Sequence, residues 1–185
     1  GTYQDQIDQA SCISCEAGKY SAELGATSTS TCQTCSKCPA GKIVISFCNI
    51  NKNIECWTCE VGKYSSGQYE SGAGSKSCES CTAGRFQGSE GQTECLTCEA
   101  GRYQSQTGQA LCTPCQAGKY SAVERATSSA VCQTCEAGKY SSAGTSECQT
   151  CEAGKYQAQT GQGSCKSCSP GKYSAVERAT SSAVC

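Results

Sequence analysis

The sequence predicts a small disulfide-rich fold, an elongated tandem array of short β-hairpin and coil modules with little helix. Three observations indicate this fold class. Cysteine accounts for 21 of the 185 residues, a level typical of disulfide scaffolds. Leu, Ile, Val and Phe together supply only 17 residues, too few for a conventional core. One short cysteine motif recurs along the whole chain, so cross-links must replace the missing apolar burial.

The recurring motif is a C-x-x-C pair whose second cysteine is followed by x-x-Gly and then Lys or Arg. The pairs begin at Cys12, Cys32, Cys56, Cys78, Cys95, Cys112, Cys132, Cys148 and Cys165. The glycine and the basic residue follow Cys15, Cys38, Cys59, Cys81, Cys98, Cys115, Cys135, Cys151 and Cys168. An aromatic residue comes next in every unit except the one that carries Ile43. Such internal similarity is the signature of a repeat protein.

Each simple unit is expected to form one loop, in which the second cysteine of a pair bonds the first cysteine of the next pair. The predicted bridges are Cys15–Cys32, Cys59–Cys78, Cys81–Cys95, Cys98–Cys112, Cys115–Cys132, Cys135–Cys148, Cys151–Cys165 and Cys168–Cys185. A loop of this length gains roughly 3 kcal/mol from its cross-link. We expect hairpins with strands of about five residues that overlap little, and modules that each contact only their neighbours.

Glycine and tyrosine are expected to shape each loop. A glycine two residues beyond the cysteine permits a positive φ and a tight turn beside the bridge. The ring that follows is expected to lie over the disulfide and shield it. The turn and packing positions are Gly18, Tyr20, Gly62, Tyr64, Gly101, Tyr103, Gly118, Tyr120, Gly138, Tyr140, Gly154, Tyr156, Gly171 and Tyr173.

The stretch from Cys35 to Cys56 departs from the simple unit. Its four cysteines, Cys35, Cys38, Cys48 and Cys56, must pair among themselves, which leaves three connectivities. It also concentrates apolar residues, among them Val44, Ile54 and Trp57. We expect a small true core with strand pairing here, and the alternative is an exposed contact surface over Cys35–Trp57.

A longer duplication suggests that the 185 residues are a window of a larger array. Residues 118–132 read GKYSAVERATSSAVC, and residues 171–185 read the same. Cys12 has no partner under the pairing rule, and Cys185 begins a further pair. We therefore expect a domain order of a truncated repeat tail over 1–12, a six-cysteine module over 13–56, single-disulfide repeats over 57–184 and a further repeat from 185.

Residues Cys15 to Cys56 resemble a six-cysteine module of the tumour necrosis factor receptor family in their spacing, C-x16-C-x2-C-x2-C-x9-C-x7-C. The resemblance implies the bridges Cys35–Cys48 and Cys38–Cys56. Because Cys38 also opens a C-x-x-G-K unit, Cys38–Cys48 with Cys35–Cys56 stays an alternative. The remaining units are similar to the cysteine-rich repeat of ephrin receptors, which also occurs in large surface proteins of algae and other single-celled eukaryotes.

Composition and cysteine spacing argue against catalysis, metal binding and binding to nucleic acid or membrane. The chain has no histidine and a net charge of −1, which gives no basis for a nucleophile–histidine pair or for nucleic-acid binding. Its longest aliphatic run, Ile43–Ile45, is far too short to insert in a membrane. C-x-x-C pairs 15–20 residues apart are also a zinc-ribbon signature, but the spacings do not alternate as paired zinc sites require. No βαβ pattern surrounds Cys32 and Cys35 to support thioredoxin-like redox chemistry. We expect no enzyme, cofactor or metal site.

The composition instead favours a non-enzymatic extracellular or cell-surface structural protein that forms a rod, stalk or surface filament, such as a ciliary hair or matrix fibre. The alternative is a receptor or adhesion ectodomain that binds a protein ligand through Cys35–Trp57. Expected partners are proteins, including further copies of the chain. The runs Thr27–Thr31 and Thr127–Ser129 offer O-glycan acceptors. A glutamate three residues before the basic residue, as in Glu16 and Lys19, predicts a weak surface ion pair or lateral pairing between rods.

Overall fold

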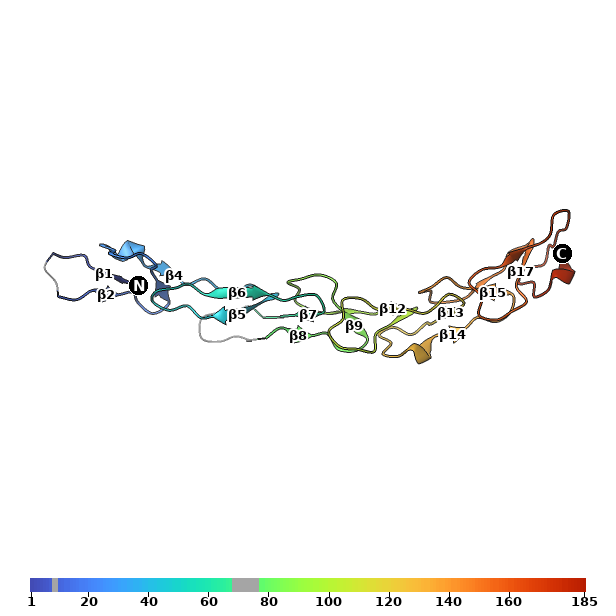
Figure 1. Ribbon diagram of the computed structural model, residues 1–185, viewed down its shortest axis with the longest axis horizontal. Coiled ribbons are helices and arrows are strands. Elements are labelled where there is room, and N and C mark those ends of the chain that lie inside the picture. Colours follow the sequence, from blue (N-terminus) through green and yellow to red (C-terminus); the bar gives the residue numbers. More distant parts are fainter. Residues whose placement is uncertain (8–9, 68–76) are drawn as a thin grey trace. The chain divides into compact units, whose positions relative to one another are not determined.

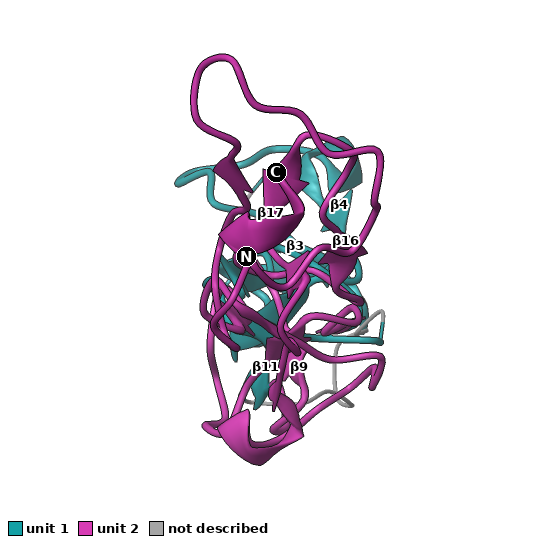
Figure 2. Ribbon diagram, turned by 90° about the vertical axis from the view of Figure 1, so that its right-hand side faces the viewer, with its two compact units in different colours: residues 1–80, 89–94 teal, residues 81–88, 95–185 magenta. Residues whose placement is uncertain are grey.

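The computed structural model describes residues 1–7, 10–67 and 77–185 (Figure 1). Asp8 and part of the loop closed by Cys59 and Cys78 lie outside the described residues. The chain forms two compact units, Gly1–Ser80 with Ser89–Glu94, and Cys81–Gly88 with Cys95–Cys185 (Figure 2). Both units are built from two-stranded antiparallel hairpins and coil. The predicted class, small, disulfide-rich and composed of tandem hairpins, is confirmed.

The described residues of the first unit form four hairpins. They pair β1 (Thr2–Tyr3) with β2 (Ile13–Ser14), β3 (Lys19–Tyr20) with β4 (Gln33–Thr34), β5 (Lys42–Ser46) with β6 (Glu55–Thr58) and β7 (Lys63–Tyr64) with β8 (Glu79–Ser80). One 3-10 turn, η1 (Thr29–Thr31), precedes Cys32. Only β5 and β6 approach the predicted strand length of about five residues. The other strands have two residues, because the turn and the disulfide close each hairpin before a longer ladder forms.

The second unit repeats one plan five times. Its hairpins pair β9 (Arg85–Phe86) with β10 (Leu96–Thr97), β11 (Arg102–Tyr103) with β12 (Thr113–Pro114), β13 (Lys119–Tyr120) with β14 (Gln133–Thr134), β15 (Lys139–Tyr140) with β16 (Gln149–Thr150) and β17 (Lys155–Tyr156) with β18 (Lys166–Ser167). The 3-10 turns η2 (Ser129–Val131) and η3 (Ser182–Val184) each precede a closing cysteine.

Ten disulfides hold these hairpins. The simple repeats follow the pairing rule: Cys15–Cys32, Cys59–Cys78, Cys81–Cys95, Cys98–Cys112, Cys115–Cys132, Cys135–Cys148, Cys151–Cys165 and Cys168–Cys185. In the central segment the bridges are Cys35–Cys48 and Cys38–Cys56, the pairing that the receptor resemblance implied. Cys12 is free and exposed.

Each repeat starts with a tight turn. In the repeat closed by Cys15–Cys32, the N–H of Lys19 donates to the carbonyl of Glu16 at 3.0 Å, and Gly18 has φ +82°. A positive φ at the third turn residue is the requirement of a type II turn, which glycine meets without steric cost. The N–H of Cys35 then donates to the carbonyl of Gly18 at 2.9 Å and closes the hairpin. The sequence therefore places glycine where the backbone needs it.

Among the described residues, the small apolar core lies in the Cys35–Cys56 segment. Val44 and Ile54 are 3% and 7% exposed and pack with the buried Cys38. Partly buried Cys48 and Cys56 complete the cluster. The shift in pairing register between Val44 and Ser46 marks a bulge in the β5–β6 hairpin. The predicted core and its strand pairing are therefore confirmed.

Successive repeats are joined by backbone hydrogen bonds. Between the repeats closed by Cys115–Cys132 and Cys135–Cys148, the bonds are Gly118 N–H to Ser141 O at 2.8 Å, Ser121 N–H to Thr145 O at 3.3 Å and Gly144 N–H to Cys115 O at 2.9 Å. The same three bonds recur at the other four junctions of the second unit. Backbone groups satisfied in this way lose little on burial, so they stabilise a junction that has few apolar side chains.

The prediction that each module contacts only its neighbours is wrong. A Cβ added to Gly138 would lie 2.5 Å from the carbonyl oxygen of Arg178, which belongs to the repeat two places further on. Arg178 also forms an ion pair with Glu136 at 2.7 Å. Gly118 lies in the same way under the carbonyl of Gly161. The short hairpins overlap, so a loop tip reaches the turn of the second repeat before it.

Candidate functional site

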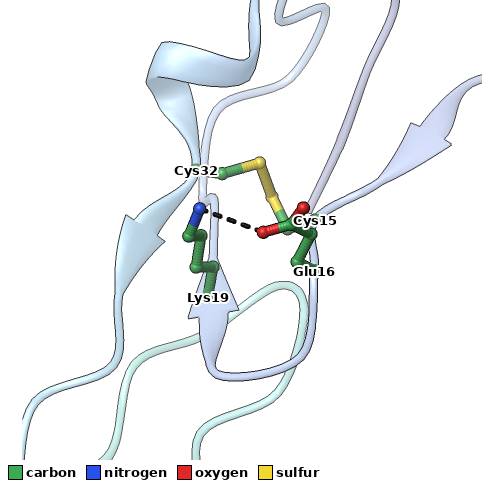
Figure 3. A network of polar contacts seen from close by, with 4 residues as sticks. All are labelled: Cys15, Glu16, Lys19 and Cys32. Carbon is green, nitrogen blue, oxygen red and sulfur yellow. Dashed lines mark hydrogen bonds and ion pairs between the residues drawn. A yellow bond between two sulfur atoms is a disulfide. The ribbon is translucent and has the colours of Figure 1, made fainter.

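The structure places a polar cleft beside several of the disulfides, at equivalent positions of the repeat. In the repeat closed by Cys15–Cys32 the cleft measures about 200 Å³. Its lining is Tyr3, Ser14, Glu16, Lys19, Thr29 and Cys32. The tyrosine belongs to the preceding repeat, while the other residues come from the two C-x-x-C ends, the turn and η1. Figure 3 shows Glu16 and Lys19 facing each other across the mouth of this turn, at 3.2 Å.

An equivalent cleft of about 270 Å³ lies beside Cys115–Cys132. Its lining is Tyr103, Pro114, Cys115, Gln116, Lys119, Ser129 and Cys132. The two clefts share the tyrosine, the lysine and a hydroxyl from the 3-10 turn. They differ in charge, because Gln116 occupies the position that Glu16 holds in the first cleft.

A third cleft, of about 400 Å³, lies beside Cys135–Cys148. It is lined by Tyr120, Gln133, Thr134, Glu136, Lys139, Glu147 and Cys148. Two carboxylates therefore accompany its lysine, and Tyr120 donates its phenol hydrogen to Gln133 at 2.8 Å. The cleft is a general product of the repeat geometry, while its charge is set by the individual sequence.

The predicted ion pairs of the turn form in part. Glu16–Lys19, Glu60–Lys63 and Glu152–Lys155 lie at 3.2, 3.8 and 3.4 Å. Glu136 instead pairs with Arg178 of a later repeat, and Arg102 donates to the carbonyl of Cys112. These side chains are mostly exposed, so each pair contributes little to stability.

The Cys35–Trp57 segment carries a separate, apolar feature. Ile45 and Trp57, on the paired strands β5 and β6, are 57% and 56% exposed, and Phe47 and Ile50 are also exposed. The segment thus has both features proposed from its sequence: a buried side, formed by Val44 and Ile54, and an exposed apolar side.

The described residues show neither a group of metal ligands nor a membrane-spanning helix. Twenty cysteines are bonded in disulfides and so offer no thiolate to a metal. Among the described residues no group of three or more potential ligands gathers. No helix in residues 1–7, 10–67 and 77–185 has the length and apolar character needed to cross a bilayer.

Comparison with protein families agrees with this architecture. Residues 15–56 match the family model for the TNFR/NGFR cysteine-rich region. Residues 67–108 and 138–185 match the model described as tyrosine-protein kinase ephrin type A/B receptor-like. Segments of the chain are therefore similar to cysteine-rich repeats of both types. No curated protein sequence matches it.

The ephrin-receptor-like and TNFR-like repeats indicate an extracellular domain that takes part in protein interactions. Modules of these two types are generally non-enzymatic parts of receptor ectodomains. Residues 109–137 lie between the two ephrin-receptor-like matches and carry the same motif, with Gly118 at φ +80°. The TNFR-like match ends at Cys56, the cysteine that closes the small core.

The predicted tyrosines occupy the same place in each repeat, directly after the basic residue of the turn. Most are half-buried, and Tyr20 and Tyr120 donate their hydroxyls across the hairpin to Gln33 and Gln133. Tyr173 differs, with 73% exposure, because Lys172 and Tyr173 are not paired in a strand. That the rings shield the disulfides stays a prediction.

A buried polar position was missed from the sequence. The residue after the aromatic is Ser or Gln and is nearly inaccessible in Ser21, Ser65, Gln87, Gln104, Ser121, Ser141, Gln157 and Ser174. Gln104 donates from Nε2 to Leu111 O and accepts from Gln106 N–H, whereas Ser121 accepts from Val123 N–H. The signal in the sequence was that only Ser and Gln occur at this position. The backbone N–H of the same residue donates to the next repeat.

Proposed function

We propose that this chain is part of a non-enzymatic extracellular structural protein whose repeats form a rod, stalk or surface filament. The observation that supports it is the repeated three-bond junction between successive ephrin-receptor-like repeats. These bonds join backbone to backbone, so they tolerate changes of loop sequence from repeat to repeat. The second-neighbour packing at Gly118 and Gly138 adds a further restraint on bending.

A structural role also agrees with how each repeat is stabilised. One disulfide closes each loop, and the junction bonds join it to its neighbours, so a repeat can be added without rebuilding a common core. We infer a division into a six-cysteine module over 13–56 and single-disulfide repeats over 57–184. Self-association and O-glycans on Thr27–Thr31 and Thr127–Ser129 belong to this proposal.

Small-angle X-ray scattering of the oxidised chain tests the proposal. The maximum dimension is expected to shrink by a constant amount per repeat when one and then two repeats are removed from the C-terminal side, in comparison with the 185-residue chain. Reduced protein, in which the bridges are opened, serves as the control for chain extension without structure. Compact particles whose dimension does not follow the repeat number would contradict the rod.

The second candidate is a receptor or adhesion ectodomain that binds a protein through Cys35–Trp57. The exposed apolar side chains Ile45 and Trp57 favour it, because solvated apolar groups on a rigid hairpin are suited to a protein contact. The sequence that flanks these residues in the full gene product discriminates between the two. A membrane span followed by a cytoplasmic domain supports the receptor, whereas many further repeats support the filament.

A further inference from the structure

We propose that the cleft beside Cys115–Cys132 binds the carboxylate of an acidic sugar. Neither the family resemblance nor the structural role assigns a ligand to this cleft. The inference rests on four of its lining residues: Tyr103, Gln116, Lys119 and Ser129. It goes beyond the proposed structural function, because a rod that lacked this site would still assemble.

The ammonium group of Lys119 is the first part of the argument. In three other repeats the lysine at this position is held by the glutamate of the same turn, as in Glu16–Lys19 at 3.2 Å. Gln116 replaces that glutamate, and Lys119 has no carboxylate partner in the part of the chain that the structure describes. The cleft therefore presents an uncompensated positive charge, which an incoming anion can bind.

The hydrogen-bonding groups around Lys119 are the second part. No acidic residue lines the cleft, and its side chains offer an amide from Gln116 and hydroxyls from Tyr103 and Ser129. The phenol of Tyr103 has no hydrogen-bond partner among the described residues, in contrast to that of Tyr120, which is bonded to Gln133. Sugar hydroxyls act as both donors and acceptors, so this set of groups complements them.

The walls of the cleft are the third part. The lining is mainly polar, and the rings of Tyr103 and Pro114 can supply its smaller apolar part. A volume of about 270 Å³ is just below the usual range of small-molecule pockets, and it suits a single ring better than an extended chain. A sugar ring has one apolar face to lie on tyrosine, which a bare inorganic anion does not. The combination selects an acidic sugar.

The equivalent cleft beside Cys15–Cys32 serves as a control within the same chain. It has the same tyrosine, lysine and 3-10 hydroxyl, in Tyr3, Lys19 and Thr29. Glu16 forms an ion pair with Lys19 and places a negative charge at the entrance of the cleft. It is therefore expected to reject an anionic sugar. Removal of that single charge should allow binding there, more weakly than beside Cys115–Cys132 because Ser14 stands where Pro114 lines the other cleft.

The test is an NMR titration of the oxidised 185-residue chain with galacturonic acid, with galactose as the neutral match and inorganic sulfate as the bare anion. Amide shifts are expected to move around Gln116, Lys119 and Ser129 with galacturonic acid only. The variants Q116E and K119Q should each weaken binding about tenfold or more. Glutamate already stands at the same turn position in several repeats, so Q116E is expected to keep the fold.

The gain-of-function variant E16Q tests the proposal more stringently than the two loss-of-function variants. It should create new galacturonate-dependent shifts around Lys19 while the shifts around Lys119 stay as in the parent chain. Equal binding of galactose, or equal binding by Q116E, would overturn the proposal. Sulfate binding as tight as that of galacturonic acid would show an unspecific anion site and would also overturn it.

Discussion

The Cys35–Cys56 segment and the repeats that follow Cys81 solve the same problem in different ways. The segment has two nested bridges, strands of five and four residues and a small core around Val44 and Ile54. Each later repeat has one bridge and no apolar cluster of its own, and all but the last have two-residue strands. Its fixed position depends on backbone bonds to neighbouring repeats.

The difference shows what an apolar core is needed for. A disulfide restricts the unfolded chain, but it does not fix the orientation of one loop against the next. In the Cys35–Cys56 segment, burial of Val44 and Ile54 does this locally. In the later repeats the same role falls to N–H groups such as those of Gly118 and Ser121, which bond the next repeat. Stability is therefore local in the first region and shared between repeats in the second.

Removal of one bridge should separate the two regions most strongly. With both cysteines of Cys98–Cys112 changed to alanine, loss of the cross-link costs about 3 kcal/mol, and amide protection should fall about a hundredfold across that repeat and both its junctions. With Cys35 and Cys48 changed to alanine, the Cys38–Cys56 bridge and the buried Cys38, Val44 and Ile54 remain. The β5–β6 amides should then stay protected. Hydrogen exchange measured residue by residue checks this, and equal loss in both variants would contradict a stabilising core.

Second-neighbour packing is tested by two glycines in the same turn sequence, Glu-Ala-Gly-Lys-Tyr. Gly138 and Gly154 have φ +77° and +79°, so alanine strains either turn by about 1 kcal/mol. At Gly138 the new Cβ would also lie 2.5 Å from Arg178 O, while Gly154 has no neighbour within 4 Å. We expect Gly138→Ala to cost about 2 kcal/mol more.

Local amide exchange in each turn measures both glycine variants. Gly154→Ala is the matched control because it carries the backbone strain without the collision. Equal destabilisation by the two variants would mean that the turn alone, and not the overlap of repeats, requires the glycine at position 138.

The core of the Cys35–Cys56 segment is tested by two neighbouring residues of β5. Val44 is 3% exposed and Ile45 is 57% exposed. Val44→Ala should reduce the free energy of local opening by about 1–2 kcal/mol, whereas Ile45→Ala should change it by less than about 0.5 kcal/mol. Exchange of the β5 and β6 amides gives both values. A larger effect at Ile45 would mean that the stabilising contacts lie on the exposed side of the hairpin, and it would contradict a stabilising core around Val44.

The bridges of the simple repeats could be predicted from sequence because cysteine spacing is regular and leaves one consistent rule. Cys35, Cys38, Cys48 and Cys56 could not be paired in this way, since three connectivities satisfy their spacing, and only the resemblance favoured the pairing found. The positive φ of glycines such as Gly18 was also predictable, because the turn itself demands it.

The contact between alternate repeats escaped prediction for a physical reason. It is made largely by backbone carbonyls, such as that of Arg178 over Gly138, and a carbonyl has no side-chain signature. The glycine that would have revealed the contact was already explained by its turn. The cleft at Lys119 escaped for a related reason, because it joins a tyrosine of one repeat to a lysine of the next.

The loop-tip arginines give the smallest expected effect. Arg125 and Arg178 have φ +53° and +56°, at a position that is glycine in other repeats, as at Gly108 and Gly144. Glycine relieves left-handed strain of about 1 kcal/mol, offset in part by the freer unfolded chain. Arg125→Gly should thus stabilise its loop by up to about 0.5 kcal/mol. Arg178→Gly should be neutral or slightly destabilising, because it also loses the Glu136 ion pair. Local exchange at the two tips compares them, and equal gains at both would show that this ion pair contributes nothing to the overlap between alternate repeats.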